Sequence, residues 1–276
     1  MGCFDGYLFL TDMDGTLTVN EKLSHENEEA IAFFQKEGGL FTMATGRGPN
    51  YLDKYRPGLI PNAPIIAING TAIYDREKEQ MLFSAFLDEQ AGEVPEYVRT
   101  HYDQLLSVSV VWSGDDWVEP FVTPSGKGML AFLPKEAKVF EGSFLDYAAS
   151  IPKPWYKVIM VVQSEASGRI LEDLRHRFGD RYKFNRSWPE GIEMHSIDSG
   201  KDVCAKWMRD HSEGRIHTIV AAGDYENDLD MIRYADIGYA VGNAVDSVKE
   251  AADRITVPNT EHAIAAIIKE LYKEIQ

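Results

Sequence analysis

Cysteine is scarce in this chain, which contains only Cys3 and Cys204 among its 276 residues. Two isolated thiols provide neither a disulfide framework nor a cluster of metal ligands. Long apolar runs are also missing near the start of the chain. The run at Tyr7–Leu10 is too short for a signal segment or a membrane span and is followed by charged residues. We therefore expect a cytoplasmic protein without a membrane partner.

Positive charge is in short supply as well. Lys and Arg total 28 against 44 Asp and Glu, so the formal net charge is −16. A protein with this charge repels nucleic acids and anionic membranes in bulk, and we expect no nucleic-acid partner. If the substrate is also an anion, its binding site needs local positive charge or a metal ion.

The order of the predicted elements indicates a large domain with a smaller one inside it, as the length of the chain also suggests. Strands alternate with helices in the first and last thirds of the sequence. The strands are predicted at 7–11, 40–44, 65–68, 216–222 and 237–241, and the helices at 24–37, after 226 and at 261–272. This alternation predicts an α/β fold with a doubly wound, mainly parallel sheet covered on both faces.

The middle of the chain follows another pattern. Strands predicted at 108–112, 117–122 and 129–133 are aromatic, alternating and close together, as in an antiparallel meander. The elements predicted after them are a helix at 135–149, a strand at 156–162, a helix at 171–178 and a strand at 182–185. We predict an α+β domain at 84–188, inserted into a core formed by 1–83 and 189–276.

Polar groups gather where the core strands end. Asp12 and Asp14 follow the first strand, and Gly15 permits a sharp turn after them. Ligands bind beyond the carboxyl ends of the strands in parallel sheets, so two carboxylates there suggest a site. An acidic turn without further function is the alternative.

Three further segments contain candidate groups. Thr45 and Gly46 follow the second strand and offer a hydroxyl and backbone N–H groups to an anion, although Thr45 could simply cap a helix. Lys201 begins a helix, and most lysines are solvated surface charges. Asp224 and Asp228 follow a later strand, where they could also be the acidic start of a helix.

Each segment has an ordinary explanation, but together they supply every group that one reaction needs. A strand with DxDGT, a strand with TGR, a lysine, and a strand with GDxxND follow one another. They resemble the four motifs of the haloacid dehalogenase superfamily, and the resemblance covers the whole chain. Asn69-Gly70 and Gly242-Asn243-Ala244 are also similar to this family. The large insert before the third motif resembles the Cof-like branch of sugar-phosphate and other small phosphate-ester phosphatases.

The resemblance implies a magnesium-dependent phosphatase with a Rossmann-like core. Asp12 would be the nucleophile that forms a phospho-aspartate, and Asp14 would donate and later accept a proton. The resemblance assigns Mg²⁺ to Asp12, the backbone carbonyl of Asp14, and Asp224. Asp228 would support the metal, often through water, and Asn227 would be a neighbouring partner.

The resemblance also implies phosphate-binding and specificity groups. Thr45, the backbone N–H of Gly46 and Lys201 would hold the phosphate oxygens that do not react. The insert would act as a cap that selects a small phosphorylated metabolite, such as a sugar phosphate. The candidate specificity residues in or near it are Asn185, Arg186, Glu193 and His195.

Three other functions share parts of this chemistry. A phosphomutase uses the same phospho-aspartate but returns the phosphate to its substrate. A sensor that binds phosphorylated metabolites without catalysis would not need both Asp12 and Asp14. Signalling receiver domains cluster Asp, Thr and Lys around Mg²⁺, but they are much shorter and place the phosphorylated Asp mid-chain.

Overall fold

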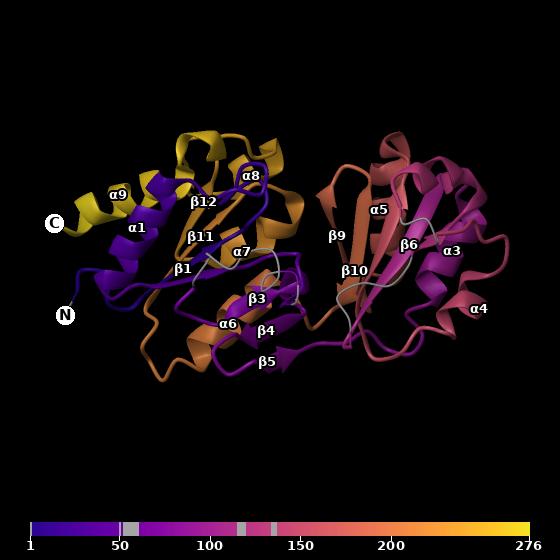
Figure 1. Cartoon of the computed structure of the whole chain (residues 1–276), viewed down its shortest axis with the longest axis horizontal. Helices are drawn as coiled ribbons and strands as arrows, with labels where there is room; N and C mark the ends of the chain where they lie inside the picture. The colour runs from indigo at the N-terminus through magenta and orange to yellow at the C-terminus, as the bar shows by residue number, and fades with distance from the viewer. Residues whose placement is uncertain (1, 50, 52–60, 115–119, 134–136) are drawn as a thin grey trace. The chain divides into compact units, whose positions relative to one another are not determined.

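The computed structural model describes residues 2–49, 51, 61–114, 120–133 and 137–276. The chain divides into two compact units (Figure 1). The core unit is Met1–Phe83 with Gly200–Gln276, and the inserted unit is Ser84–Ser199.

A parallel sheet runs through the core unit. Its strands are β1 (Tyr7–Thr11), β2 (Leu40–Met43), β11 (Thr218–Gly223), β12 (Ile237–Ala240) and β13 (Arg254–Ile255). They lie in the order β13-β12-β11-β1-β2, and every pairing is parallel. A smaller sheet contains β3 (Ile65–Ala67), β4 (Ala72–Asp75) and β5 (Gln80–Ser84). The predicted α/β class with a mainly parallel sheet is confirmed.

Helices cover both faces of the parallel sheet. On one face, α1 (His25–Lys36) and α9 (Ala263–Ile275) pack with Phe9 of β1. On the other face, α6 (Lys201–Asp210) and α7 (Leu229–Tyr234) pack with Leu8 and Leu10 of the same strand. Successive side chains of a strand point to opposite faces, so both faces of β1 must be apolar. This is why β1 is an unbroken apolar run.

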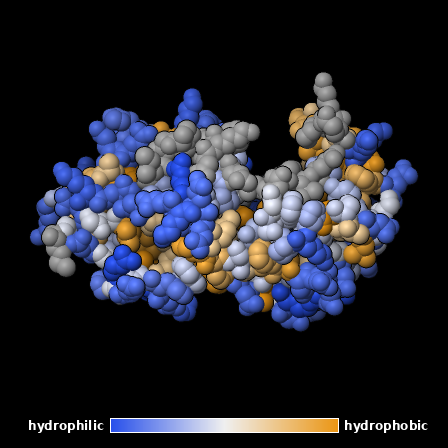
Figure 2. All heavy atoms as spheres, turned by 60° about the horizontal axis from the view of Figure 1, so that its bottom comes forward, coloured by the Kyte–Doolittle hydropathy of each residue, from blue (hydrophilic) through white to orange (hydrophobic). Residues whose placement is uncertain are grey.

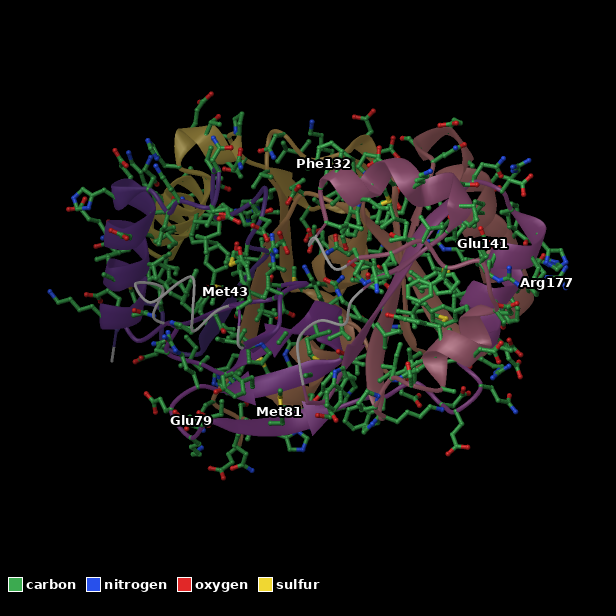
Figure 3. The ribbon with its side chains drawn as sticks, turned by 45° about the vertical axis from the view of Figure 1, so that its right-hand side comes forward. Met43, Glu79, Met81, Phe132, Glu141 and Arg177 are labelled. Atoms are coloured by element: carbon green, nitrogen blue, oxygen red, sulfur yellow. The ribbon has the colours of Figure 1, made fainter. Side chains whose placement is uncertain are left out.

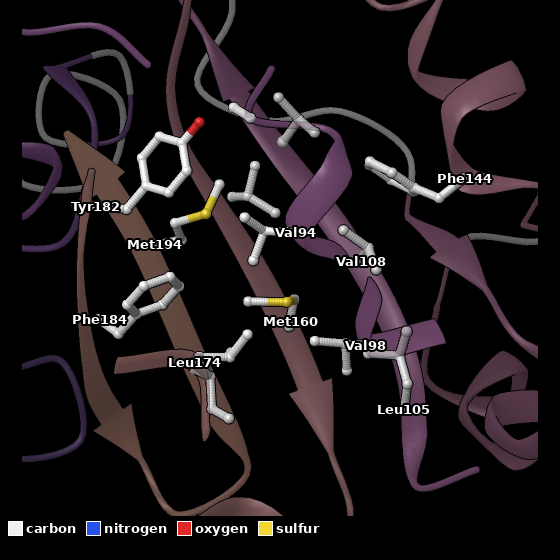
Figure 4. Close-up of a cluster of buried hydrophobic side chains, with 14 of the residues drawn as sticks. Val94, Val98, Leu105, Val108, Phe144, Met160, Leu174, Tyr182, Phe184 and Met194 are labelled. Atoms are coloured by element: carbon white, nitrogen blue, oxygen red, sulfur yellow. The ribbon is translucent and has the colours of Figure 1, made fainter. Parts of the chain in front are cut away.

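The inserted unit is built on an antiparallel sheet. Its strands are β6 (Leu105–Trp112), β7 (Phe121–Val122), β8 (Trp155–Val162), β9 (Tyr182–Trp188) and β10 (Gly191–Ser196), in the order β7-β6-β8-β10-β9. Its helices are α3 (Glu93–His101), α4 (Phe144–Ala148) and α5 (Ser164–Phe178). Side chains from strands and helices form one buried cluster, which includes Val98, Met160 and Leu174 (Figure 4). The unit therefore has a hydrophobic core of its own.

The second boundary of the inserted unit lies later than the sequence pattern suggests. The predicted boundary falls between 188 and 189, whereas the compact units divide between Ser199 and Gly200. The reason is β10, which pairs with β8 and β9 and completes the antiparallel sheet. This strand is not among the elements predicted from the sequence.

Two predicted elements of the inserted unit are wrong. The segment 129–133 is not a strand, because the 3-10 helix η2 (Pro124–Ala131) occupies most of it. Thr123 begins η2 by accepting a hydrogen bond from the Gly126 N–H, and Phe132, just after its end, is 91% exposed (Figure 3). The helix predicted at 135–149 is reduced to α4, and its residues 135 and 136 lie outside the described residues. Residues 117–119 of another predicted strand also lie outside them.

Hydrophilic residues predominate on the face of the molecule drawn in Figure 2, with hydrophobic residues exposed between them. Within the part of the chain that the structure describes, no helix combines the length and apolar character needed to cross a membrane.

Candidate active site

Three carboxylates of the core unit meet where two neighbouring strands end. Asp12 follows β1, and Asp224 and Asp228 follow β11. The two strands pair in parallel with Thr11 opposite Ala222, so their carboxyl ends share one edge of the sheet. Carboxylate oxygens of all three residues lie within 4.8 Å of one another. Asp12 and Asp228 are buried, and Asp224 is partly buried.

Lys201 is the cation of this cluster. It is the first residue of α6, and its Nζ donates to Asp12 Oδ1 at 2.7 Å and to Asp228 Oδ1 at 2.6 Å. Its side chain is 1% exposed, so Lys201 is not the solvated surface lysine that its sequence context also allowed. One buried ammonium group therefore contacts two buried carboxylates, with the partly buried Asp224 close to them.

Burial is the main influence on the pKa values of Asp12, Asp224 and Lys201, and the charges of their neighbours modify its effect. Burial raises the pKa of Asp12 well above its usual range; Asp228 and Asp224 raise it further, and Lys201 lowers it. Burial and the neighbouring Asp228 raise the pKa of Asp224 to about 7. Burial by itself would lower the pKa of Lys201, but Asp12 and Asp228 raise it above the usual value.

The donor set suits a hard divalent cation. Mg²⁺ prefers oxygen ligands and usually keeps several of its waters. The three carboxylates offer such oxygens at a spacing that one ion could bridge, and their excess negative charge is what an ion would neutralise. The residues present therefore fit the magnesium ion that the motifs imply.

A tight turn after β1 brings its end against Asp224. Gly15 has φ +92°, and a Cβ there would lie 2.5 Å from Asp224 Oδ2, so only glycine fits. Thr16 Oγ1 donates to Asp224 Oδ1 at 2.7 Å, and Asn243 Nδ2 donates to Gly15 O at 2.8 Å. Our sequence analysis assigned no role to Thr16 or Asn243, although both lie in segments that resemble the family.

Thr45 and Gly46 follow β2, and phosphate contacts are expected at both residues. Thr45 is 1% exposed, and its Oγ1 accepts from the Arg47 N–H at 3.1 Å. This contact resembles the helix cap that was the alternative role for Thr45. Because Oγ1 is the acceptor in this contact, the hydroxyl group can still donate its hydrogen to another group. A Cβ at Gly46 would meet Asn69 Oδ1 at 3.2 Å, so the backbone here is closely approached by that side chain.

Asn227 contacts a strained loop. Its Nδ2 donates to Asn69 Oδ1 at 3.1 Å. Three consecutive residues, Ile68, Asn69 and Gly70, have φ values of 53°, 56° and 81°. A β-branched residue rarely adopts such a backbone, and strain of this kind is found at functional sites. The sequence pattern instead predicted that the strand continues through Ile68.

The candidate specificity residues belong to the inserted unit. Glu193 and His195 alternate along β10 with Ile192 and Met194, which point into the hydrophobic cluster. Glu193 and His195 therefore share the opposite face of the sheet, and the register places Asn185 across from Glu193.

Arg186 is separated from these three residues. It follows Asn185 in β9, so its side chain points to the other face, and its Nη1 lies 3.5 Å from Ser167 Oγ of α5. The structure thus brings three of the four candidates together and leaves Arg186 on the helix side of the sheet.

A buried ion pair lies on the face that carries Glu193. Lys157 Nζ of β8 donates to Glu193 Oε2 at 2.7 Å, and the two side chains are 4% and 3% exposed. His195 lies between Asn185 Nδ2, at 3.1 Å from its Nε2, and Ser199 Oγ, at 2.7 Å from its Nδ1. Burial lowers the pKa of His195 to about 4. Lys157 had no role in our sequence analysis.

Comparison with known proteins gives one family. The family model described as haloacid dehalogenase-like hydrolase matches residues 9–268. A 5-amino-6-(5-phospho-D-ribitylamino)uracil phosphatase of Bacillus subtilis, YcsE, is 26% identical over 267 residues, covering 95% of this chain and 94% of its own. The pyridoxal phosphate phosphatase YbhA of Escherichia coli is 26% identical over 275 residues, with coverage of 93% and 95%.

A solved structure shares the fold. The sugar phosphatase BT4131, described as subclass IIB of the same superfamily, superposes with a TM-score of 0.73 at 19% identity. The match covers 98% of this chain and 99% of that one. The arrangement of a parallel core with an inserted α+β unit is therefore found in a known phosphatase.

Proposed function

The chain belongs to the haloacid dehalogenase-like hydrolase family, and we propose that it is a phosphatase that hydrolyses a small phosphorylated metabolite through a phospho-aspartate on Asp12. The observation that carries this proposal is the cluster of Asp12, Asp224, Asp228 and Lys201 at the carboxyl end of the parallel sheet. We further propose that the substrate belongs to the sugar-phosphate class.

The first step is a transfer of the phosphoryl group to Asp12. A carboxylate oxygen of Asp12 attacks phosphorus, the bond from phosphorus to the ester oxygen breaks, and Asp14 donates a proton to the leaving oxygen. The products of this step are a free alcohol and an acyl phosphate on Asp12.

The second step restores the enzyme. A water molecule attacks the phosphorus of the acyl phosphate while Asp14, now a carboxylate, accepts its proton. Inorganic phosphate leaves, and Asp12 returns as a carboxylate. During both steps the Thr45 hydroxyl, the Gly46 N–H and the Lys201 ammonium group hold the oxygens that do not react.

The magnesium ion would be held by Asp12, the backbone carbonyl of Asp14, and Asp224. Asp228 would support the ion, often through water, and Asn227 would be a neighbouring partner. When bound, the ion would offset the repulsion between the Asp12 carboxylate and the anionic phosphate ester. The buried excess of carboxylates around Lys201 supports this assignment.

We propose that the inserted unit, Ser84–Ser199, is the cap that selects the substrate. Support comes from the polar face of its sheet, where Asn185, Glu193 and His195 offer hydrogen-bonding groups. Substitutions of these residues should change kcat/KM between substrates, while hydrolysis of p-nitrophenyl phosphate is largely kept. A panel of phosphorylated sugars, pyridoxal phosphate and 5-amino-6-(5-phospho-D-ribitylamino)uracil would identify the preferred substrate class.

Trapping of the phospho-enzyme tests the assignment of Asp12 and Asp14. Asp12→Asn should give no phospho-enzyme from any labelled ester. Asp14→Asn should still be phosphorylated by an ester with a good leaving group, because such a group needs little protonation, and should lose the label slowly. Label found on another residue of Asp12→Asn would overturn the assignment.

Removal of divalent cations tests the metal. EDTA should abolish hydrolysis of p-nitrophenyl phosphate, and added Mg²⁺ should restore it, because Asp12 cannot approach the phosphate without charge compensation. Full activity in the presence of chelator would exclude a catalytic metal.

A further inference from the structure

One side chain of the core unit contacts the proposed proton donor directly. Arg47 Nε donates to Asp14 Oδ2 at 2.9 Å. Among the residues that the structure describes, this is the only hydrogen bond to the Asp14 carboxylate. Both side chains are about four-tenths exposed, at 42% for Arg47 and 41% for Asp14. Because solvent screens such an exposed pair, we expect it to add little to the free energy of unfolding.

The backbone of Arg47 is fixed at two points. Its N–H donates to Thr45 Oγ1 at 3.1 Å, and its carbonyl oxygen accepts from the Ile68 N–H at 3.0 Å. The second contact comes from the loop with left-handed backbone that continues through Asn69 and Gly70. These two contacts fix the position of the Arg47 backbone, from which its side chain extends. They involve Thr45, a proposed phosphate-binding residue, and the loop at Ile68.

The Arg47 guanidinium group also contacts an aromatic ring, that of Tyr51. Its central carbon lies 4.4 Å from the centre of the Tyr51 ring, within the range of a cation–π contact. The Tyr51 hydroxyl in turn donates to Glu21 Oε1 at 2.9 Å. A chain of contacts thus runs from Glu21 through Tyr51 and Arg47 to Asp14.

We propose that Arg47 is a positioning residue that sets the orientation of the Asp14 carboxylate for proton transfer. The proposal rests on the proposed function, in which Asp14 serves the leaving oxygen and then the attacking water. A proton donor works only within hydrogen-bond reach of its target, and a half-exposed Asp side chain otherwise samples several rotamers. The hydrogen bond from Arg47 Nε to Asp14 Oδ2 restricts the rotation of the Asp14 side chain.

A direct role in phosphate binding is the competing explanation. Guanidinium groups bind phosphate oxygens well, and Arg47 lies beside Thr45 and Gly46 in sequence. In that case the loss of Arg47 would weaken binding of every ester and of inorganic phosphate alike. A positioning role predicts instead that the loss depends on how much proton donation the leaving group needs.

A double-mutant cycle separates the two explanations. We would measure first-turnover release of the leaving group for wild type, Arg47→Met, Asp14→Asn and the double variant. The esters would run from p-nitrophenyl phosphate, with a good leaving group, to an alkyl phosphate, with a poor one. For Arg47→Met we expect a loss of at least about tenfold with the alkyl ester and little loss with the nitrophenyl ester. On the Asp14→Asn background, the same substitution should cost almost nothing.

Three further measurements keep the test decisive. Arg47→Lys should recover part of the alkyl-ester rate, because it keeps a cationic donor near Asp14. Arg233→Met removes another exposed arginine of the core unit, paired with Asp230 at 3.8 Å, and should leave both rates unchanged. Thermal unfolding should show that Arg47→Met remains folded.

The outcomes point to different failures. Equal losses for all esters, the same loss on the Asp14→Asn background, or a raised inhibition constant for inorganic phosphate would overturn the positioning role in favour of phosphate binding. If Asp14→Asn itself fails to discriminate between esters, the proposed function of Asp14 is what fails.

Discussion

The two units bury charge in different ways. In the core unit, Asp12 and Asp228 contact the ammonium group of Lys201, and Asp224 lies close to both carboxylates. In the inserted unit, Lys157 and Glu193 form a pair of one cation and one anion, with side chains 4% and 3% exposed. One cluster carries an excess of negative charge, and the other is balanced.

This difference predicts different roles for the two lysines. A balanced ion pair can satisfy its own charges without a ligand, although removing one partner is costly. A buried cluster with excess carboxylates is costly until a cation neutralises it. Burial, with a further contribution from neighbouring carboxylates, raises the pKa values of Asp12 and Asp224. We therefore expect the proposed reaction to depend on the charge of Lys201, and we expect Lys157 to act mainly by holding Glu193 in place.

Replacing the two lysines should give the largest contrast. Lys201→Met removes a preorganised cation from the proposed phosphate site, so activity towards p-nitrophenyl phosphate should fall by about 10²–10³-fold. Lys157→Met leaves the buried Glu193 carboxylate without this partner, so the free energy of unfolding should fall by about 3–5 kcal/mol. Kinetic assays and urea unfolding of both variants provide the measurements.

The comparison fails if the two lysines behave alike. Assays of Lys157→Met must be made below its unfolding transition, where it should keep most of its nitrophenyl phosphatase activity. A Lys157→Met variant that is folded but as inactive as Lys201→Met would place Lys157 in the catalytic machinery.

The core fold followed from its sequence because local pattern and burial agree there. The apolar run at β1 corresponds to a predicted strand. The helix α1 corresponds to the helix predicted at 24–37, and Ser24 accepts from the Asn27 N–H at its start. Ile68 shows the limit of such reasoning. Its β-branched side chain favours a strand, but contacts of the loop with Arg47 and Thr45 hold its backbone at φ 53°. At Ile68, hydrogen bonds from the loop to residues distant in the sequence therefore outweigh the preference of the side chain for an extended backbone.

The clustering of the candidate site residues could be predicted in part for a related reason. Asp12, Lys201 and Asp228 belong to motifs, and the parallel sheet brings the strand ends together. The pairing of Arg47 with Asp14 spans 33 positions, and that of Lys157 with Glu193 spans 36. No local periodicity connects residues so far apart, so these partners emerge only from the folded chain.

Replacing the whole Lys157–Glu193 pair should sharpen the contrast further. Lys157→Met with Glu193→Leu removes both charges and keeps apolar bulk, so the double variant should recover most of the stability that either single variant loses. We expect a recovery of roughly 3 kcal/mol in the free energy of unfolding, measured by urea denaturation. A double variant that loses the sum of the two single losses would show that Glu193 is needed for more than pairing with Lys157.

The smallest predicted effect concerns pH and His195. Burial lowers its pKa to about 4; Lys183 and Lys157 also lower it, and Glu193 raises it. An unfolded His titrates near 6.5, so between these values the unfolded chain binds more protons than the folded one. This contribution to stability is therefore present above about pH 6.5 and is lost as the pH falls towards 4.

The size of that loss can be measured by difference. From pH 7 to pH 5, protonation of His195 in the unfolded chain should lower the free energy of unfolding by about 2 kcal/mol. His195→Gln removes this titration, so urea unfolding of the variant should lose about 2 kcal/mol less than wild type between the two pH values, and all other groups cancel in the comparison. His176→Gln, an exposed histidine of α5 in the same unit, is the matched control and should lose as much as wild type. An identical pH dependence for His195→Gln and wild type would mean that His195 is not held neutral by its surroundings. His195 could then be protonated in the folded protein, although Lys157 and Glu193 on the same face of the sheet are buried.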